Sequence, residues 1–132
     1  MATYSYTAFS TEIPPIPLMP IQLRTPGLQP RITFDGQSIL DTGSDCTLVP
    51  LPFLRQVNAQ IAGRSIRIPV GGLQAIGIPY TVGIRFDHYV LDAVQVFGCP
   101  VEDIGELLIV GRDLMNFYRI EFDGQNSVFT IF

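Results

Sequence analysis

Short apolar runs closed by proline or glycine turns recur along the whole chain. Residues 2–9 are aromatic and β-branched, which predicts a strand. Residues 13–23 are apolar but are interrupted by four prolines, a pattern typical of an extended edge segment. Further short runs are IQLRT, RITFDG and SILDTG, with Pro26–Gly27 and Asp35–Gly36 as turn signals between them.

The second half of the chain repeats this pattern of short apolar runs separated by turns. SIRIPV and AIGIPYTVGIRF flank Gly71–Gly72 and predict a β-hairpin with a glycine-rich tip. HYVLDAVQVF alternates and predicts another strand, whereas PLPFLRQ permits a short helix or a turn. GELLIVGRDLMNFY starts apolar and is expected to become helical near Arg112. YRIEFDG and SVFTIF predict a closing hairpin that turns at Asp123–Gly124. We therefore expect a single all-β domain over residues 1–132, with one short helix near its C-terminus.

The composition excludes several classes of function but does not identify one. The chain has 132 residues, 47% of them apolar, which suits one globular domain with its own core. The net charge is −4 and the 8 basic residues are scattered singly. The sequence therefore lacks the cluster of basic residues that is typical of nucleic-acid-binding proteins, and we expect no nucleic-acid partner. With 2 cysteines and 1 histidine, the sequence offers neither a disulfide framework nor a zinc set, and we expect no metal or cofactor. No signal peptide or membrane-spanning run is evident, so we expect a soluble, cytoplasmic protein with no membrane partner.

One segment contains residues suited to catalysis. It is the run from Ser38 to Asp45, SILDTGSD. A strand over its apolar start brings Asp41 out of the core at the strand end. Gly43 then allows a tight turn and a close approach of N–H groups to the carboxylate. The hydroxyls of Thr42 and Ser44 can hold that carboxylate in place. The alternative is an ordinary turn, because Asp, Thr, Gly and Ser are all common turn residues.

A single carboxylate is not enough for amide hydrolysis. One ionised carboxyl must take a proton from water while a protonated one polarises the carbonyl, and two carboxyls held close together share one proton. The sequence contains one Asp-Thr-Gly, at Asp41. The second must come from another chain, which predicts a two-fold homodimer.

The chain resembles the retroviral-type aspartic proteases, the retropepsins, and is nearest to their bacterial and cellular single-domain members. ILDTGSDCTLVP is similar to the active-site segment of that family. LLIVGRDLMNFYRIEFDG is similar to the second signature, in which two apolar residues and a glycine, here Ile109–Val110–Gly111, precede Arg-Asp and a short helix. The hairpin around Gly71–Gly72 falls between the two signatures, where the family carries its flap. The resemblance covers residues 31–123 and implies a folded-over β-sheet acid-protease protomer that pairs as a dimer.

The resemblance implies roles for the residues of the motif. Asp41 is the expected catalytic carboxylate, and Thr42 is expected to bond its counterpart across the two-fold axis. Gly43 is expected to present its backbone to a peptide or protein substrate. A hydroxyl at Ser44 is expected to donate to ionised Asp41.

Further residues receive supporting roles by the same resemblance. Asp45 is expected to contact the substrate backbone and to pair with Arg112; the alternative is an ordinary surface ion pair. The remaining expected substrate-binding residues are Gly71, Gly72, Leu73 and Val110, and Asp113 joins Arg112 as structural support.

Several alternatives stay open on the sequence alone. The same fold could serve as a catalytically silent peptide-binding domain, because a fold does not fix an activity. The run SVFTIF either supplies a strand to the dimer interface or caps its own sheet. Cys46 is interpreted as a packing residue, and redox control of the nearby site is the lesser alternative. His88 is interpreted as a solvated turn residue, and the acidic cluster of Glu102, Asp103 and Glu106 is interpreted as a solvated loop.

Overall fold

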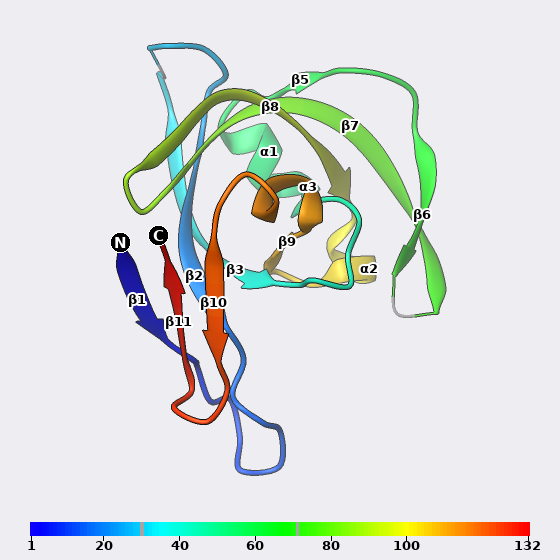
Figure 1. Cartoon of the computed structure of the whole chain (residues 1–132). Coiled ribbons are helices and arrows are strands. Elements are labelled where there is room, and N and C mark those ends of the chain that lie inside the picture. The colour runs from blue at the N-terminus through cyan, green and yellow to red at the C-terminus, as the bar shows by residue number, and fades with distance from the viewer. Residues whose placement is uncertain (30, 71) are drawn as a thin grey trace.

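The computed structural model describes residues 1–29, 31–70 and 72–132 and is dominated by β-strands (Figure 1). The strands are β1 (Ala2–Ser5), β2 (Leu18–Arg24), β3 (Thr33–Leu40), β4 (Leu48–Pro50), β5 (Gln60–Ile61), β6 (Ile66–Val70), β7 (Leu73–Phe86), β8 (Tyr89–Cys99), β9 (Leu108–Val110), β10 (Ile120–Asp123) and β11 (Val128–Ile131). Three short helices lie between them: α1 (Leu51–Gln56), α2 (Val101–Ile104) and α3 (Arg112–Met115).

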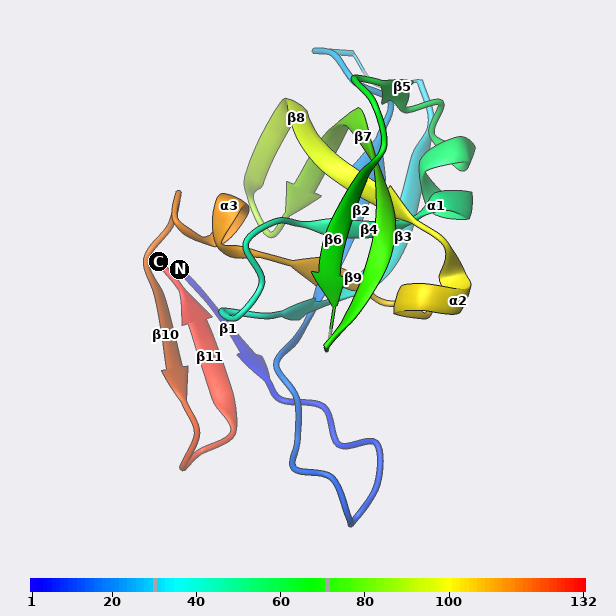
Figure 2. The same cartoon turned by 90° about the vertical axis from the view of Figure 1, so that its right-hand side faces the viewer.

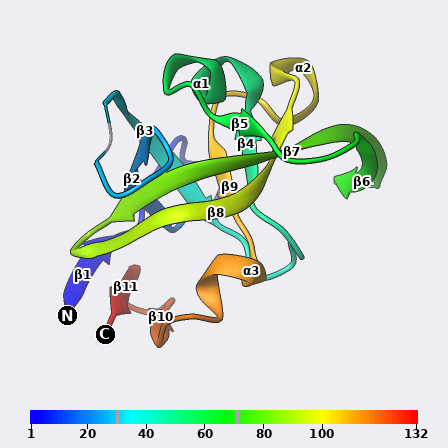
Figure 3. The same ribbon diagram turned by 90° about the horizontal axis from the view of Figure 1, so that it is seen from above.

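Six strands form a closed ring in the order β2–β3–β9–β4–β8–β7, which the pairing of β2 with β7 completes. Figure 3 shows this ring from above. The parallel pair β3–β9 sets Leu40 beside Val110, so both strands end together at one edge of the barrel. Buried apolar side chains fill the interior, among them Met19, Leu23, Leu54, Val82, Ile84, Val96 and Leu108.

The predicted hairpin around the glycine pair is confirmed. β6 pairs antiparallel with the first part of β7, from Val70 opposite Leu73 to Ile66 opposite Gly77. The rest of β7 pairs with β8 and is part of the barrel. The hairpin therefore projects from the barrel as a two-stranded arm at the right of Figure 1, and it lies in front of the barrel in Figure 2.

The two ends of the chain form a separate three-stranded sheet, in the order β1–β11–β10. The closing hairpin turns at Asp123–Gly124 as predicted, and the Asp123 carboxylate accepts hydrogen bonds from the backbone and side chain of Asn126. β11 contains most of SVFTIF and is the central strand of this sheet. In the single chain, the run therefore caps its own sheet.

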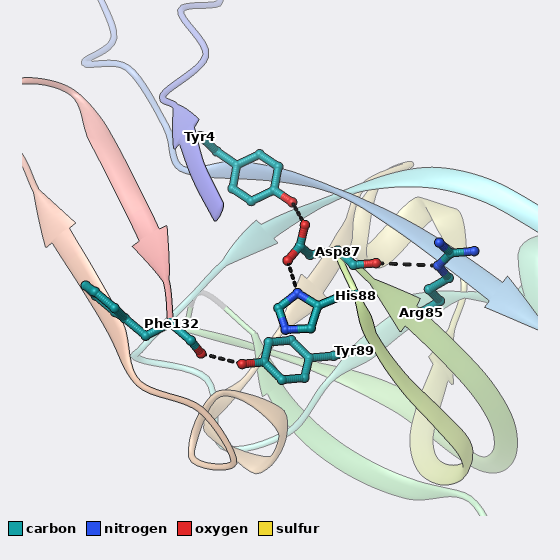
Figure 4. A network of polar contacts seen from close by, with 6 residues as sticks. All are labelled: Tyr4, Arg85, Asp87, His88, Tyr89 and Phe132. Carbon is teal, nitrogen blue, oxygen red and sulfur yellow. Dashed lines mark hydrogen bonds and ion pairs between the residues drawn. The ribbon is translucent and has the colours of Figure 1, made fainter. Parts of the chain in front are cut away.

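Side chains of the β7–β8 turn form hydrogen bonds that connect this terminal sheet to the barrel (Figure 4). The Tyr4 hydroxyl of β1 donates to the Asp87 carboxylate, which also contacts His88. The Tyr89 hydroxyl donates to the carbonyl of Phe132. His88 is exposed and at the turn, as expected from the sequence.

The structure corrects the predicted helix content and the first strand. Beside the expected helix near Arg112, it contains α1, where the sequence permits a helix or a turn, and α2, where the sequence predicts a solvated loop. α2 begins after Pro100, whose fixed φ suits a helix start, and it ends at Gly105 with φ of +77°. β1 ends at Ser5 rather than continuing to residue 9. In the described part of the chain, no helix is long and apolar enough to span a membrane.

Candidate active site

Asp41 stands directly after β3, at the edge where β3 and β9 end together. Its N–H donates to the carbonyl of Val110 at 3.0 Å, which ties the start of the loop to β9. The N–H of Gly43 donates to the Asp41 Oδ1 at 2.9 Å, and the N–H of Ser44 donates to the Asp41 carbonyl at 3.1 Å. Asp41 is half-buried, and the bond from Gly43 holds its carboxylate in place.

The loop that follows Asp41 rests against the start of α3. A Cβ on Gly111 would lie 2.5 Å from the carbonyl oxygen of Cys46 and 2.9 Å from its nitrogen, so only glycine fits there. Immediately after it, the N–H of Arg112 donates to the carbonyl of Ser44 at 2.9 Å. The two sequence signatures thus meet through their backbones, which explains why a glycine stands in the second one.

A buried polar clamp below this contact was not found from the sequence. Thr47 is fully buried, and its N–H and hydroxyl donate to the two carboxylate oxygens of Asp113 at 3.0 and 2.7 Å. The Thr47 hydroxyl also accepts from the N–H of Gly111 at 3.2 Å. Asp113 additionally accepts from the N–H of Leu114, so its expected supporting role has a clear structural basis. The available signal was one hydroxyl inside the otherwise apolar run CTLVP.

The expected pairing of Arg112 with Asp45 is present. The guanidinium also donates from Nη1 to the carbonyl of Thr42 at 2.8 Å. Both side chains of the ion pair are exposed, so the pair contributes little to stability by itself. Because the same guanidinium holds Thr42 and Asp45, its main effect is on the shape of the loop.

Two predicted residues take other positions than expected. The Ser44 hydroxyl donates to the carbonyl of Cys46 at 2.7 Å, so the expected bond from this hydroxyl to Asp41 is wrong for the single chain. The backbone of Gly43 takes that place instead. Val110 is only 3% exposed and its side chain packs in the core, so it supports the loop from beneath through its carbonyl.

A cavity of about 220 Å³ separates the active-site loop from the flap hairpin. Its lining residues are Gly43, Ser44, Asp45, Cys46, Ile66, Arg67, Ile68 and Pro69. At the hairpin tip, Gly72 has φ of +84° and Leu73 is 77% exposed; Gly71, also expected here, lies outside the described residues. A larger cavity, of about 400 Å³, lies over β2, β3 and β7 and has no residue of the active-site loop in its lining.

Both cysteines are free, and both pack in a small cluster beneath the flap. Burial raises the pKa of Cys99 to about 11. Burial, reinforced by the charges of Asp113 and Asp45, also raises the pKa of Cys46. These shifts favour the neutral thiols and the packing role. Among the described residues, no cluster of three or more His, Cys, Asp or Glu side chains could hold a metal ion.

Comparison with known proteins identifies the fold. No family model and no curated protein sequence matches the chain. Among solved structures, EIAV protease in complex with the inhibitor HBY-793 is similar, with a TM-score of 0.56 at 16% sequence identity. The match covers 84% of this chain and 93% of that chain. The chain has the retropepsin protomer fold. At this level of identity, the likeness concerns the fold, and the activity must be argued from the site itself.

Proposed function

We propose that the protein is an aspartic endopeptidase, which hydrolyses peptide bonds with a water molecule activated by Asp41 and the same residue of a second copy. The observation that carries this proposal is the fixed position of the Asp41 carboxylate. It lies directly after β3 and accepts the N–H of Gly43 at 2.9 Å, in a chain with the retropepsin protomer fold.

The chemistry follows from two such carboxylates on a two-fold axis. Held close together, they share one proton because both cannot remain ionised. The ionised carboxylate takes a proton from water as the water attacks the scissile carbonyl, and the protonated one donates a hydrogen bond to the carbonyl oxygen. The tetrahedral intermediate collapses when its nitrogen is protonated and the C–N bond breaks. No covalent enzyme intermediate is needed.

The homodimer is part of the proposal. The described chain has a single Asp-Thr-Gly loop, and Thr42 next to the catalytic carboxylate is exposed and free to meet a second copy. The cavity between the loop and the flap offers room for the substrate of one half-site, and the flap is expected to close over a bound peptide.

The decisive experiment is incubation with a diverse peptide mixture, with and without pepstatin, comparing the wild type with Asp41→Asn. We expect cleavage by the wild type, inhibition by pepstatin and a loss of at least about a thousandfold in Asp41→Asn. The variant keeps the size of the side chain, so circular dichroism is expected to be unchanged. Because a shared proton makes only the singly ionised pair active, the rate is expected to follow a bell in pH. Cleavage by Asp41→Asn at the wild-type rate would refute the assignment.

A further inference from the structure

The cavity of about 400 Å³ over β2, β3 and β7 lies where two strands of the barrel separate. β3 pairs with β2 along the whole of Leu18–Arg24, whereas β7 pairs with β2 only along Gln22–Arg24. The cavity lies beside the remaining part of β2, and its lining includes Pro20, Ile21 and the turn residue Asp87. Its volume is within the range of about 300–1,000 Å³ that is usual for small-molecule sites.

A row of polar side chains crosses the wall of this cavity. Asp35 of β3 lies opposite Gln22 of β2, which in turn lies opposite Arg85 of β7. Residues directly opposite one another share a face of the sheet. Their neighbours Leu23 and Ile84 are fully buried, so the polar row faces outward. Two strand spacings, about 10 Å in total, separate the backbones of Asp35 and Arg85.

The two charges of this row have no charged partner within the chain. The Asp35 Oδ1 accepts a hydrogen bond from the Gln22 side-chain amide at 3.1 Å. The Arg85 Nε donates to the carbonyl of Asp87 at 3.4 Å, and the Asp87 carboxylate turns the other way, toward Tyr4 of β1 (Figure 4). Within the described residues, neither Asp35 nor Arg85 forms an ion pair. A carboxylate and a guanidinium therefore line one cavity without neutralising each other.

We propose that this cavity binds a short zwitterionic peptide of about two residues, with its carboxylate on Arg85 and its ammonium group on Asp35. A guanidinium can hold a carboxylate through two parallel hydrogen bonds, and such charge-assisted bonds are stronger than neutral ones. An extended dipeptide spans at most about 7 Å, which suits two charged side chains whose backbones lie about 10 Å apart. A simple anion or cation would leave one of the two side chains without a partner.

The neutral residues of the lining favour a peptide over other zwitterions. Gln22 and Gln37 line the cavity with amide groups, which can both donate to and accept from a peptide bond. Pro20 is exposed and offers an apolar contact to a side chain of the peptide. The lining contains no residue of the active-site loop, so this site is separate from the proposed peptidase site.

The first test compares three peptides on the wild-type protein. Alanylalanine carries both charges, its N-acetyl derivative lacks the ammonium group, and its amide lacks the carboxylate. In an NMR titration, we expect alanylalanine to shift the backbone amide signals of Gln22, Asp35 and Arg85. We also expect it to bind about tenfold more tightly than either blocked form. Equal affinities for the three peptides, shifts confined to the loop at Gly43, or no shift at millimolar peptide would overturn the proposal.

The second test assigns each charge of the peptide to a side chain. Arg85 and Asp35 are exposed, so Arg85→Gln and Asp35→Asn are expected to keep the fold, which circular dichroism checks. We expect Arg85→Gln to bind alanylalanine about tenfold more weakly and to lose the preference over the amide. Asp35→Asn is expected to lose the preference over the N-acetyl form.

The matched control is Arg64→Gln, which changes an exposed arginine between β5 and β6, outside the cavity. We expect this variant to bind all three peptides as the wild type does. If Arg85→Gln still prefers alanylalanine to its amide, Arg85 does not hold the carboxylate and the proposal is wrong. A protein that binds alanylalanine here but cleaves no peptide would keep this site and refute the peptidase. A protein that cleaves peptides but does not bind alanylalanine would refute this site alone.

Discussion

The active-site loop and the flap hairpin face one another across the same cavity, but they are built in opposite ways. The loop from Asp41 to Cys46 is bonded to β9, to α3 and to itself, and it leaves no room for a side chain at Gly111. Within the described part of the chain, the hairpin of β6 and the start of β7 forms strand pairs only with itself, and Leu73 near its tip is exposed. Catalytic groups need a fixed geometry, whereas a lid must move for substrate to enter. We therefore expect substitutions to be tolerated less well in the active-site loop than in the hairpin.

The strongest test of the rigid half is Gly111→Ala. The added methyl group would press against the backbone of Cys46, which cannot move aside as a flexible side chain could. We expect the free energy of unfolding to fall by about 3 kcal/mol and peptidase activity to be lost. Gly124→Ala is the control, since nothing lies within 4 Å of its Cβ position. Urea denaturation of both variants measures the difference, and equal stabilities would show that the loop does not rest on α3.

Thr47→Val tests the buried clamp that holds the loop from below. The change removes a hydroxyl that donates to Asp113 and accepts from Gly111, and it leaves the partly buried carboxylate with one hydrogen bond fewer. We expect a loss of about 1–3 kcal/mol in the free energy of unfolding. Thr130→Val removes an exposed hydroxyl bond to Thr3 and is expected to cost less than about 0.5 kcal/mol. A similar cost in both variants would refute the clamp.

Gly72→Val tests the flap. Valine is strained at φ of +84°, although the space around the position is open, so we expect a cost of about 1–2 kcal/mol. Gly105→Val imposes the same strain at φ of +77°, at the end of α2 and outside the hairpin of β6 and β7. Both variants are expected to lose similar stability, but only Gly72→Val is expected to lower kcat/KM by about tenfold. Equal kcat/KM values would place the lid elsewhere.

The smallest effect concerns the thiols beneath the flap. Because the pKa of Cys99 is about 11, roughly one molecule in a thousand carries its thiolate at pH 8. The pKa of Cys46 is raised as well, so its reactivity is expected to increase as the pH rises above neutral. In a thiol-labelling assay on the folded protein at pH 7.5, we expect slow reaction of Cys46 and none of Cys99, and full reaction of both in denaturant. Rapid labelling of folded Cys99 would contradict its burial.

The sequence predicted the features whose causes lie close together along the chain. The glycine-rich hairpin, the closing turn at Asp123–Gly124 and the Asp-Thr-Gly turn at the end of a strand all have local signals. The sequence could not reveal that the Ser44 hydroxyl bonds to Cys46, because serine has several acceptors within reach and only the folded loop selects one. Helix α2 was missed since four residues are too few to show a helical period.

The amino-acid sequence by itself determined an all-β domain with a single Asp-Thr-Gly at a strand end, because alternation, turn residues and one short motif act over a few positions. Only the tertiary structure decided which distant segments meet. It closed the barrel by pairing β2 with β7, placed Gly111 against Cys46, joined Thr47 to Asp113 and enclosed β11 between the chain's own β1 and β10. Such contacts depend on packing and backbone pairing between residues far apart in the chain, and no local pattern encodes them.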